Sequence, residues 1–177
     1  AIIDSGGANI ASVQFALERL GAKSVLTQDV SVIQSADKVL LPGVGAAPVA
    51  MQSLIESGLI DCIRGLTQPV MGICLGMQLL FARSPEGNTP LLGIFDADCE
   101  TFTPSHGRSV PHMGWNRLST RQDHPLMAGV EEGAHVYFVH SYFAPVTAQT
   151  VAATSYGDDF TAIVAENNFT GCQFHPE

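Results

Sequence analysis

A cysteine between two glycines is the feature of this sequence best suited to do chemistry. The segment Gly72-Ile73-Cys74-Leu75-Gly76 follows an apolar run and precedes residues typical of a helix. This is the layout of a nucleophile elbow with sulfur in place of oxygen, because side chains flanking so sharp a turn would collide with neighbouring backbone. A helix N-terminus also stabilises a thiolate, so we expect the pKa of Cys74 to lie below the ordinary value of about 8.5.

The alternative is that Cys74 is an unreactive core residue, as most cysteines in apolar segments are. Its glycine neighbours and its place between a strand and a helix support the two interpretations about equally. The remaining cysteines, Cys62, Cys99 and Cys172, have no comparable setting, and we interpret them as structural. The four cysteines are irregularly spaced and form no C-x-x-C pair, so the sequence predicts neither a zinc site nor a disulfide framework.

A thiol nucleophile needs a base, and the base needs a carboxylate that orients it. His175-Pro176-Glu177 can supply both, because residues two apart on an extended chain point the same way. Glu177 can then fix the tautomer of the His175 ring. The other histidines lack such a neighbour, and we interpret them as ordinary surface or core residues: His106, His112, His124, His135 and His140.

The segment Pro42-Gly43-Val44-Gly45 follows an apolar strand and could supply backbone N–H groups to a developing oxyanion. Glycine lets a peptide plane reorient without side-chain clash, and the N–H of Leu75 could join the same hole. Taken alone the motif is better explained as an ordinary turn, because Pro-Gly is the commonest kind of turn signal.

The elements that must position these groups alternate between strands and helices in the first half of the chain. Strands are predicted at 1–4, 24–27, 37–41 and 69–73. Helices are predicted from Ile10 to Leu20, closed by Gly21, then around Met51, Leu54, Ile55 and Leu59, and from Leu75 to Ala82. Such alternation indicates βαβ units around a parallel sheet.

The second half is strand-rich, with predicted strands at 136–143, 150–156, 161–166 and 170–175 between Gly, Asp, Asn and Pro turns. We therefore expect an α/β sandwich with a mostly parallel central sheet and an antiparallel extension. The first strand is short and the last has no following element, so we expect a parent protein slightly longer at both ends.

The composition excludes several classes of protein. Of the 177 residues 46% are hydrophobic and 14% are charged, which excludes a disordered chain. The net charge of -9 is the wrong sign for a nucleic-acid partner. No apolar run approaches the roughly 20 residues of a membrane helix, and no targeting segment stands at the start, so we expect a single cytoplasmic domain.

The motifs together resemble a known family. The run from Gly72 to Gln78, with the late Gln173-Phe174-His175-Pro176-Glu177, resembles the class I glutamine amidotransferases over nearly the whole chain. The runs 111–116 and 137–142 are similar to those of the glutaminase subunits of imidazole glycerol phosphate synthases. The resemblance implies a flavodoxin-like three-layer sandwich, one amidotransferase domain over 1–177, and neither a cofactor nor a metal.

It also implies roles for individual residues. Cys74 would attack the carboxamide of L-glutamine, His175 would act as base and then as acid, and Glu177 would orient His175. A glutamyl thioester would form and be hydrolysed to glutamate, with release of ammonia. The remaining roles are the oxyanion hole at Gly43, Val44, Gly45 and Leu75, the glutamine pocket at Gly76, Gln78, Ser141 and Tyr142, and a partner-facing surface at Trp115, Asn116 and Tyr137.

The implied partner is a (β/α)8-barrel cyclase subunit, in a heterodimer that receives the ammonia and makes imidazole glycerol phosphate and AICAR in histidine biosynthesis. One alternative is the amidotransferase subunit of another synthase, such as an anthranilate or guanylate type. Another is a catalytically silent binding module in which Cys74 is structural. A metal hydrolase is disfavoured because no H-E-x-x-H spacing occurs. Trp115 and Tyr137 could equally be core aromatics.

Overall fold

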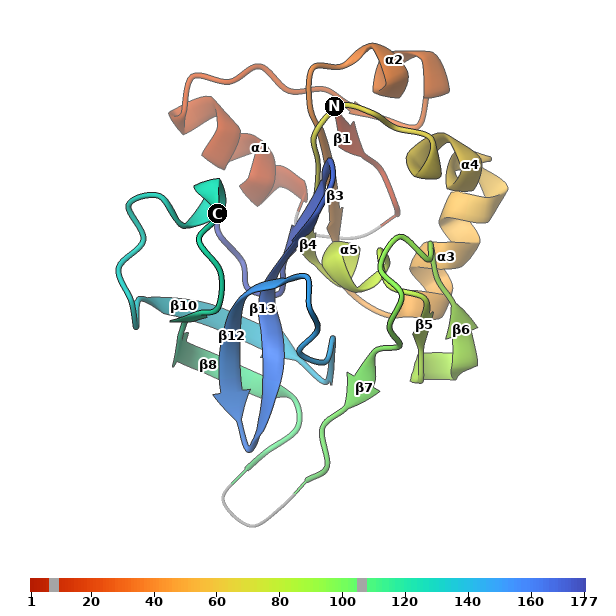
Figure 1. The fold of residues 1–177 in the computed structure, drawn as a ribbon. Helices are drawn as coiled ribbons and strands as arrows, with labels where there is room; N and C mark the ends of the chain where they lie inside the picture. Colours follow the sequence, from red (N-terminus) through yellow and green to blue (C-terminus); the bar gives the residue numbers. More distant parts are fainter. Residues whose placement is uncertain (7–9, 105–107) are drawn as a thin grey trace.

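An eight-stranded sheet forms the centre of the computed structural model, which describes residues 1–6, 10–104 and 108–177 (Figure 1). The strand order is β2-β1-β3-β4-β14-β13-β12-β9. The parallel part contains β2 (Leu26–Thr27), β1 (Ile2–Ile3), β3 (Val39–Gly43), β4 (Val70–Cys74) and β14 (Phe169–Cys172). The antiparallel part adds β13 (Asp158–Glu166), β12 (Thr150–Tyr156) and β9 (Ser119–Thr120). The expected α/β sheet with an antiparallel extension is confirmed.

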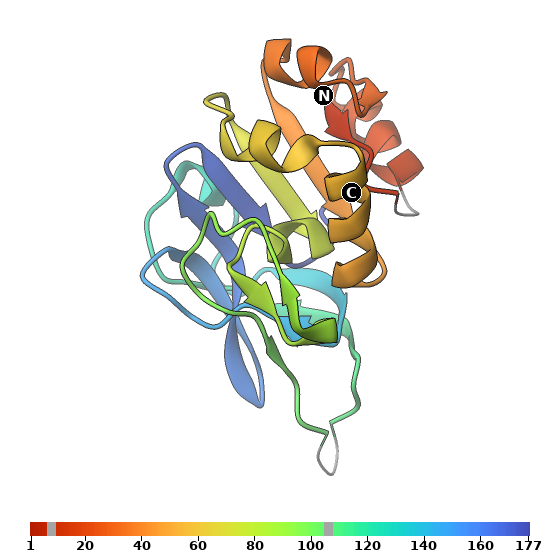
Figure 2. The ribbon, with the colours of Figure 1, turned by 90° about the vertical axis from the view of Figure 1, so that its right-hand side faces the viewer.

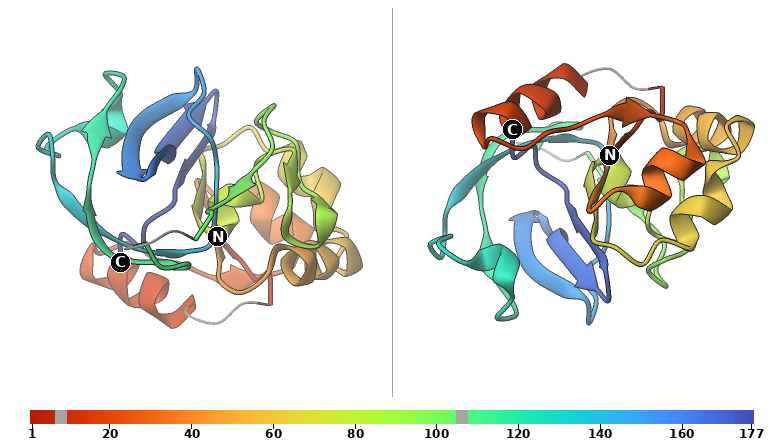
Figure 3. Two further views of the ribbon diagram at one scale, coloured as in Figure 1. Left: turned by 90° about the horizontal axis from the view of Figure 1, so that it is seen from below. Right: turned by 90° about the horizontal axis from the view of Figure 1, so that it is seen from above.

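Helices cover both faces of the parallel strands. On one face lie α2 (Val30–Ser35), α3 (Ala47–Glu56) and α4 (Leu59–Arg64), and α1 (Ile10–Arg19) lies on the other (Figures 2 and 3). The neighbours Ile2 and Ile3 point to opposite faces, since successive strand residues alternate, and both are fully buried. Ile3 packs with residues of α3 and α4, whereas Ile2 packs with Val13 of α1. Two apolar cores thus flank one sheet.

An antiparallel pair, β8 (His112–Arg117) and β10 (His135–His140), lies on the same side as α1. Phe138 of β10 is fully buried and joins the core that contains Ile2 and Val13. The shorter elements are β5 (Arg83–Ser84), η1 (Glu86–Asn88), β6 (Thr89–Pro90), β7 (Glu100–Thr101), η2 (Pro125–Met127) and β11 (Tyr142–Phe143).

The helix predicted from Leu75 to Ala82 is shorter than expected. It is α5 (Leu75–Gln78), only four residues long. The carbonyl groups of Leu79, Leu80 and Phe81 accept hydrogen bonds from N–H groups of residues 92–94 instead of from a further helical turn. The apolar run is buried as predicted, but tertiary hydrogen bonds replace its helical ones.

Two other boundaries differ from the sequence expectations. The predicted helix through Leu59 divides into α3 and α4 at Gly58, whose φ of 67° is left-handed, and Ile55 faces solvent. The predicted strand at 136–143 breaks at Ser141, because β10 pairs with β8 whereas β11 pairs with β7. Residues 7–9, which precede the first predicted helix, and His106 lie outside the described residues.

The segment from residue 169 to residue 177 brings His175 to the same edge of the sheet as Cys74. The strand predicted at 170–175 ends at Cys172, where β14 runs parallel to β4 with Cys172 opposite Ile73. The next residues leave the sheet at the edge where Cys74 ends β4. His175 therefore reaches the carboxyl end of the same strands as Cys74, where ligands bind in open α/β sheets.

Candidate active site

Cys74 occupies a backbone conformation that few side chains adopt. Its φ is 55° and its ψ is -115°, directly between β4 and α5. A Cβ on Gly72 would lie 2.6 Å from the carbonyl oxygen of Gly76, and a Cβ on Gly76 would lie 1.7 Å from that of Leu41. No side chain fits at either distance, so the sharp turn predicted from the two glycines is confirmed.

Burial changes the acidity of Cys74 in the direction opposite to our expectation. Its pKa is raised to about 11, mainly because burial disfavours the thiolate; the Leu75 N–H lowers it, the Glu177 carboxylate raises it, and Gln173 lowers it. We expected the following helix to lower the pKa, but α5 has only four residues and its field does not compensate for lost solvation. The thiol is therefore neutral at pH 7 until a base removes its proton.

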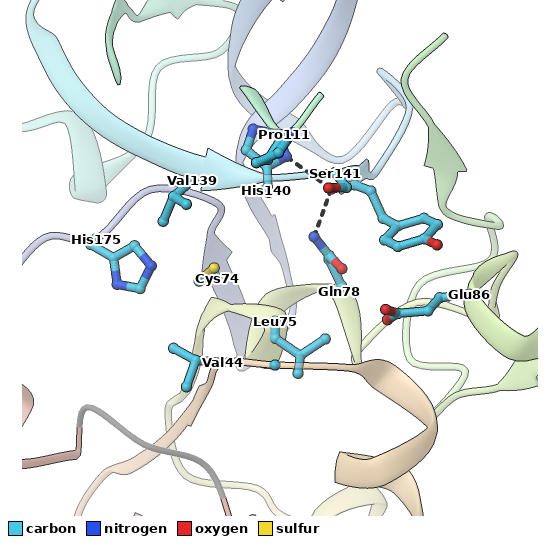
Figure 4. A pocket seen from close by; sticks show the side chains of 12 residues that line it. Val44, Cys74, Leu75, Gln78, Glu86, Pro111, Val139, His140, Ser141 and His175 are labelled. Carbon is cyan, nitrogen blue, oxygen red and sulfur yellow. Dashed lines mark hydrogen bonds between the residues drawn. The ribbon is translucent and has the colours of Figure 1, made fainter. Parts of the chain in front are cut away.

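His175 and Glu177 form the expected pair. Nδ1 of His175 lies 3.1 Å from Oε1 of Glu177, and both side chains are largely buried. Because a carboxylate only accepts, Nδ1 of the neutral ring carries the proton and Nε2 is left as the basic nitrogen. The His175 ring and the Cys74 side chain line the same pocket (Figure 4). Glu177 thus sets the tautomer that a general base needs.

The pocket has a volume of about 300 Å³. Of the residues predicted for the site, it is lined by Val44, Gly45, Cys74, Leu75, Gln78, Ser141, Tyr142 and His175. Three predicted residues lie behind the lining. Glu177 contacts His175, Gly43 is paired with Cys74 in the sheet, and Gly76 packs α5 against β3.

The sequence did not point to four residues that line the pocket: Glu86, Pro111, Val139 and His140. Glu86 begins η1 within a loop that carries no motif, and its Oε2 accepts the N–H of Ala47 at 2.7 Å. Pro111 and Val139 lie in motifs quoted for the family resemblance, but nothing in their residue types indicated a site. The sequence predicts His140 to be an ordinary histidine, but it lines the pocket.

Gln78 connects the pocket wall to Cys74 through Gln173. Its Nε2 donates to the carbonyl of Tyr142 at 2.8 Å and to Oε1 of Gln173 at 2.9 Å. Nε2 of Gln173 in turn lies 3.8 Å from the sulfur of Cys74. Gln173 is fully buried and was part of the quoted motif, yet no role was assigned to it. The amide orientation of both glutamines follows from this chain of donors.

The residues expected to face a partner lie on the paired strands β8 and β10. Trp115 of β8 is 70% exposed, and its ring packs edge-on against that of Tyr137 in β10 at 5.7 Å. The core alternative is therefore wrong for Trp115. Tyr137 is half-buried, and Asn116 donates to the carbonyl of Ser155 at 3.0 Å.

Among residues 1–6, 10–104 and 108–177, no group of three or more His, Cys, Asp or Glu side chains is arranged to hold a metal ion. Over the same residues, no helix has the length and apolar character needed to cross a membrane.

Comparison with known proteins decides the family. The model of the glutamine amidotransferase class-I family matches residues 1–177. This chain belongs to that family. The glutamine amidotransferase assignment thus agrees with the turn at Cys74 and with the pocket beside it.

Individual members of the family are similar over the full length. The imidazole glycerol phosphate synthase subunit HisH of Xanthomonas axonopodis pv. citri (strain 306) is 52% identical over 177 residues, which are 100% of this chain and 88% of that protein. The subunit of the same name from Mannheimia succiniciproducens is 49% identical over 176 residues, 99% of this chain and 90% of that protein.

Solved structures of amidotransferases share the fold at low identity. A glutamine amidotransferase crystal structure superposes with a TM-score of 0.74 at 19% identity, over 99% of this chain and 89% of that one. A glutamine amidotransferase from Thermotoga maritima gives 0.68 at 15% identity, over 98% of this chain and 74% of that one. The expected three-layer class I amidotransferase fold is confirmed.

Proposed function

We propose that this chain is the glutaminase subunit of an imidazole glycerol phosphate synthase, with Cys74 as nucleophile, His175 as base and Glu177 as the residue that orients it. The observation that carries the proposal is the strained turn that presents Cys74 to a pocket shared with the His175–Glu177 pair. The similarity to the HisH subunits supports the choice of synthase.

The first chemical step follows from the raised pKa of Cys74. Nε2 of His175 takes the thiol proton as the sulfur attacks the carboxamide carbon of glutamine, and the carbonyl oxygen becomes an oxyanion. The imidazolium then gives its proton to the departing nitrogen, so that ammonia leaves and a glutamyl thioester remains. His175 next takes a proton from water, whose oxygen attacks the thioester carbon. The C–S bond then breaks, the imidazolium returns its proton to the sulfur, and the products are glutamate and the free thiol.

The oxyanion requires N–H donors that are already in place. The N–H of Leu75 is directed to Cys74, at the start of α5. Val44 and Gly45 face the same pocket, and the φ of Gly45 is 94°, with no atom within 4 Å of a Cβ placed there. We assign the second donor to the 43–45 segment, since glycine allows its peptide to turn an N–H inward.

Substrate orientation follows from the charges around the pocket. Cys74 and His175 lie at one end, whereas Glu86 lies at the other (Figure 4). Glu86 is the carboxylate among the described lining residues, so it is suited to the α-ammonium group of glutamine. Gln78, Ser141 and Tyr142 line the wall between them. Free glutamine thus fits with its carboxamide at the sulfur.

The partner surface is assigned to the exposed side of β8. Met113 is 61% exposed and Trp115 is 70% exposed, on alternate positions of one strand. Exposed Trp and Met side chains are typical of interface anchors. We assign this surface to a (β/α)8-barrel cyclase subunit, which would receive ammonia in a cytoplasmic heterodimer.

The test is glutamine hydrolysis by the wild-type chain and by Cys74→Ala, each alone and with the barrel subunit. We expect the wild type to release glutamate and the variant to lose activity by at least about 10⁴-fold, as for loss of other nucleophiles. A glutamine-analogue electrophile should label the wild type stoichiometrically at Cys74.

Each alternative predicts a different result. A silent binding module would not be labelled and would hydrolyse no glutamine with any partner. An amidotransferase of another synthase would hydrolyse glutamine but would not co-purify with the barrel subunit. Either result would overturn the corresponding part of the proposal.

A further inference from the structure

Two histidines that the proposed reaction does not use are buried against each other. His112 is 3% exposed and His140 is 6% exposed, and Nδ1 of His112 lies 3.1 Å from Nε2 of His140. The register of β8 and β10 places them directly opposite. His140 also lines the pocket, so this pair is continuous with the site.

The Tyr142 carbonyl oxygen fixes the donor and acceptor roles of the ring nitrogens in both histidines. Nδ1 of His140 lies 2.8 Å from the carbonyl oxygen of Tyr142, which can only accept, so Nδ1 carries the proton. Nε2 of His140 must then accept, and Nδ1 of His112 must donate to it. His112 is left with an accepting Nε2, which lies 3.4 Å from the amide nitrogen of Asn116.

The surroundings keep both rings neutral. The pKa of His140 is lowered to about 4, mainly by burial; the hydrogen bond to the Tyr142 carbonyl raises it, and His112 and His175 lower it. Burial likewise lowers the pKa of His112. Aromatic rings surround the pair from several elements: Phe102, Phe138, Tyr156 and Phe160. A protonated ring would place two N–H groups against each other in this apolar setting.

The chain of donors reaches the substrate wall through Tyr142. Its carbonyl accepts from both His140 and Gln78, as the dashed lines of Figure 4 show. Both N–H bonds of the Gln78 amide are used, one by Tyr142 and one by Gln173. Oε1 of Gln78 consequently points to the side of the pocket that holds Glu86 (Figure 4). The amide oxygen of Gln78 and the carboxylate of Glu86 are therefore the two acceptors at the end assigned to the α-ammonium group.

We propose that His140, held in its Nδ1–H tautomer by His112, is a positioning residue that fixes the Tyr142 carbonyl and thereby directs the Gln78 amide oxygen toward the α-ammonium group of glutamine. The inference rests on the proposed glutaminase function. It makes selection for the α-amino group depend on a histidine pair that touches neither the sulfur nor the scissile bond.

Steady-state kinetics of the complex with the barrel subunit test this selection. The values of KM and kcat are compared for glutamine and for glutaramate, which lacks the α-amino group. His140→Leu removes the donor, His140→Asn keeps a donor near the Nδ1 position, and His135→Leu is the control at the exposed start of β10. For His140→Leu we expect the KM for glutamine to rise about tenfold or more with kcat little changed, the usual effect of a lost bond that orients a charged group.

Glutaramate turnover should change by less than about twofold in His140→Leu, because this substrate has no α-ammonium group to lose its acceptor. His140→Asn should recover most of the glutamine affinity, because it restores a donor to the Tyr142 carbonyl. The His135→Leu control should resemble the wild type. An equal loss for both substrates, or failure of His140→Asn to differ from His140→Leu, would overturn the proposal.

A second measurement needs no variant to fold. ¹⁵N–¹H correlation spectra of the histidine rings at pH 7 should show His112 and His140 both neutral and protonated at Nδ1. A cationic ring, or a proton at Nε2 of either residue, would refute the proposed donor and acceptor roles of the two histidines. If the wild type shows these tautomers but hydrolyses no glutamine with its partner, the proposed function fails while the histidine arrangement stands.

Discussion

The two sides of the pocket are built by different physical means. On one side Cys74 is fixed by backbone packing, since Gly72 and Gly76 leave no space for even a methyl group. On the other side His112 and His140 hold the Tyr142 carbonyl through side-chain hydrogen bonds. Steric fixing has no dependence on pH, whereas a hydrogen-bonded pair of rings depends on its protonation state.

The contrast also appears in how each side faces solvent. The turn at Cys74 lies between the sheet and α5, with buried neighbours throughout. The strand β8 instead buries His112 and exposes Met113 and Trp115. Cys74 is therefore held within the domain, while the wall opposite it includes Val139 and His140 of β10, which pairs with a strand, β8, whose outer side is exposed.

The largest expected effect is the loss of stability when the close packing around Cys74 is disrupted. Gly76→Ala places a Cβ 1.7 Å from the Leu41 carbonyl oxygen, so α5 and β3 must separate. We expect a loss of more than about 3 kcal/mol of stability, or roughly 10 °C in Tm. Thermal unfolding followed by circular dichroism measures it.

Gly133→Ala is the matched control for that substitution. Its φ of 78° is left-handed, but no atom lies within 4 Å of the added Cβ. Backbone strain alone predicts a cost of about 1 kcal/mol. Equal losses in the two variants would mean that close packing does not hold the turn.

Acid should lower the stability that the buried, neutral His140 contributes. The folded pKa of His140 is lowered to about 4 from 6.5, so between these values the unfolded chain binds a proton that the folded chain does not. Stability is therefore complete above about pH 6.5 and is lost as the pH falls toward 4, by at most about 3 kcal/mol for this group.

Urea unfolding of the wild type and of His140→Asn at several pH values measures that loss. The stability difference between them should narrow on acidification, because the variant lacks the titrating ring. Parallel curves from pH 7 to pH 4 would show that His140 is not held neutral by the fold.

A smaller effect is expected from the exposed side of β8. Trp115→Ala should weaken binding of the barrel subunit by about 2 kcal/mol, the range of an interface anchor, with little change in Tm because the side chain is 70% exposed. Val49→Ala, which truncates an apolar side chain that is 68% exposed on α3, should leave binding unchanged.

Calorimetric titration of the barrel subunit measures both variants. Trp115 is the only tryptophan in the sequence, so its fluorescence also reports docking in the wild type. Unchanged affinity of Trp115→Ala would remove this strand from the proposed interface.

The smallest expected effect lies at a distance from both sides of the pocket. Arg121 and Asp159 form an ion pair at 3.1 Å, with side chains 44% and 54% exposed. Solvent screens such pairs, so Arg121→Gln should cost less than about 1 kcal/mol. A larger loss in urea unfolding, or any change in the KM for glutamine, would mean that polar surface contacts contribute as the buried histidines do.

The local sequence pattern was sufficient to predict the groups of the site that lie close together in the sequence. The glycines around Cys74 indicate a steric requirement within five residues, and His175 and Glu177 are two residues apart. In the folded chain that pair lies 3.1 Å apart. The alternation of apolar runs likewise predicted the parallel sheet, since each run has to bury one face of its own element.

Only the tertiary structure decided the rest, because the responsible groups are distant in sequence. His112 and His140 are 28 positions apart and meet through the register of β8 and β10. The pKa of Cys74 is raised because burial depends on every surrounding element, whereas the helix that we expected to lower it is cut short by hydrogen bonds from residues 92–94. Short-range sterics are encoded locally, but solvation and long-range pairing exist only once the chain has folded.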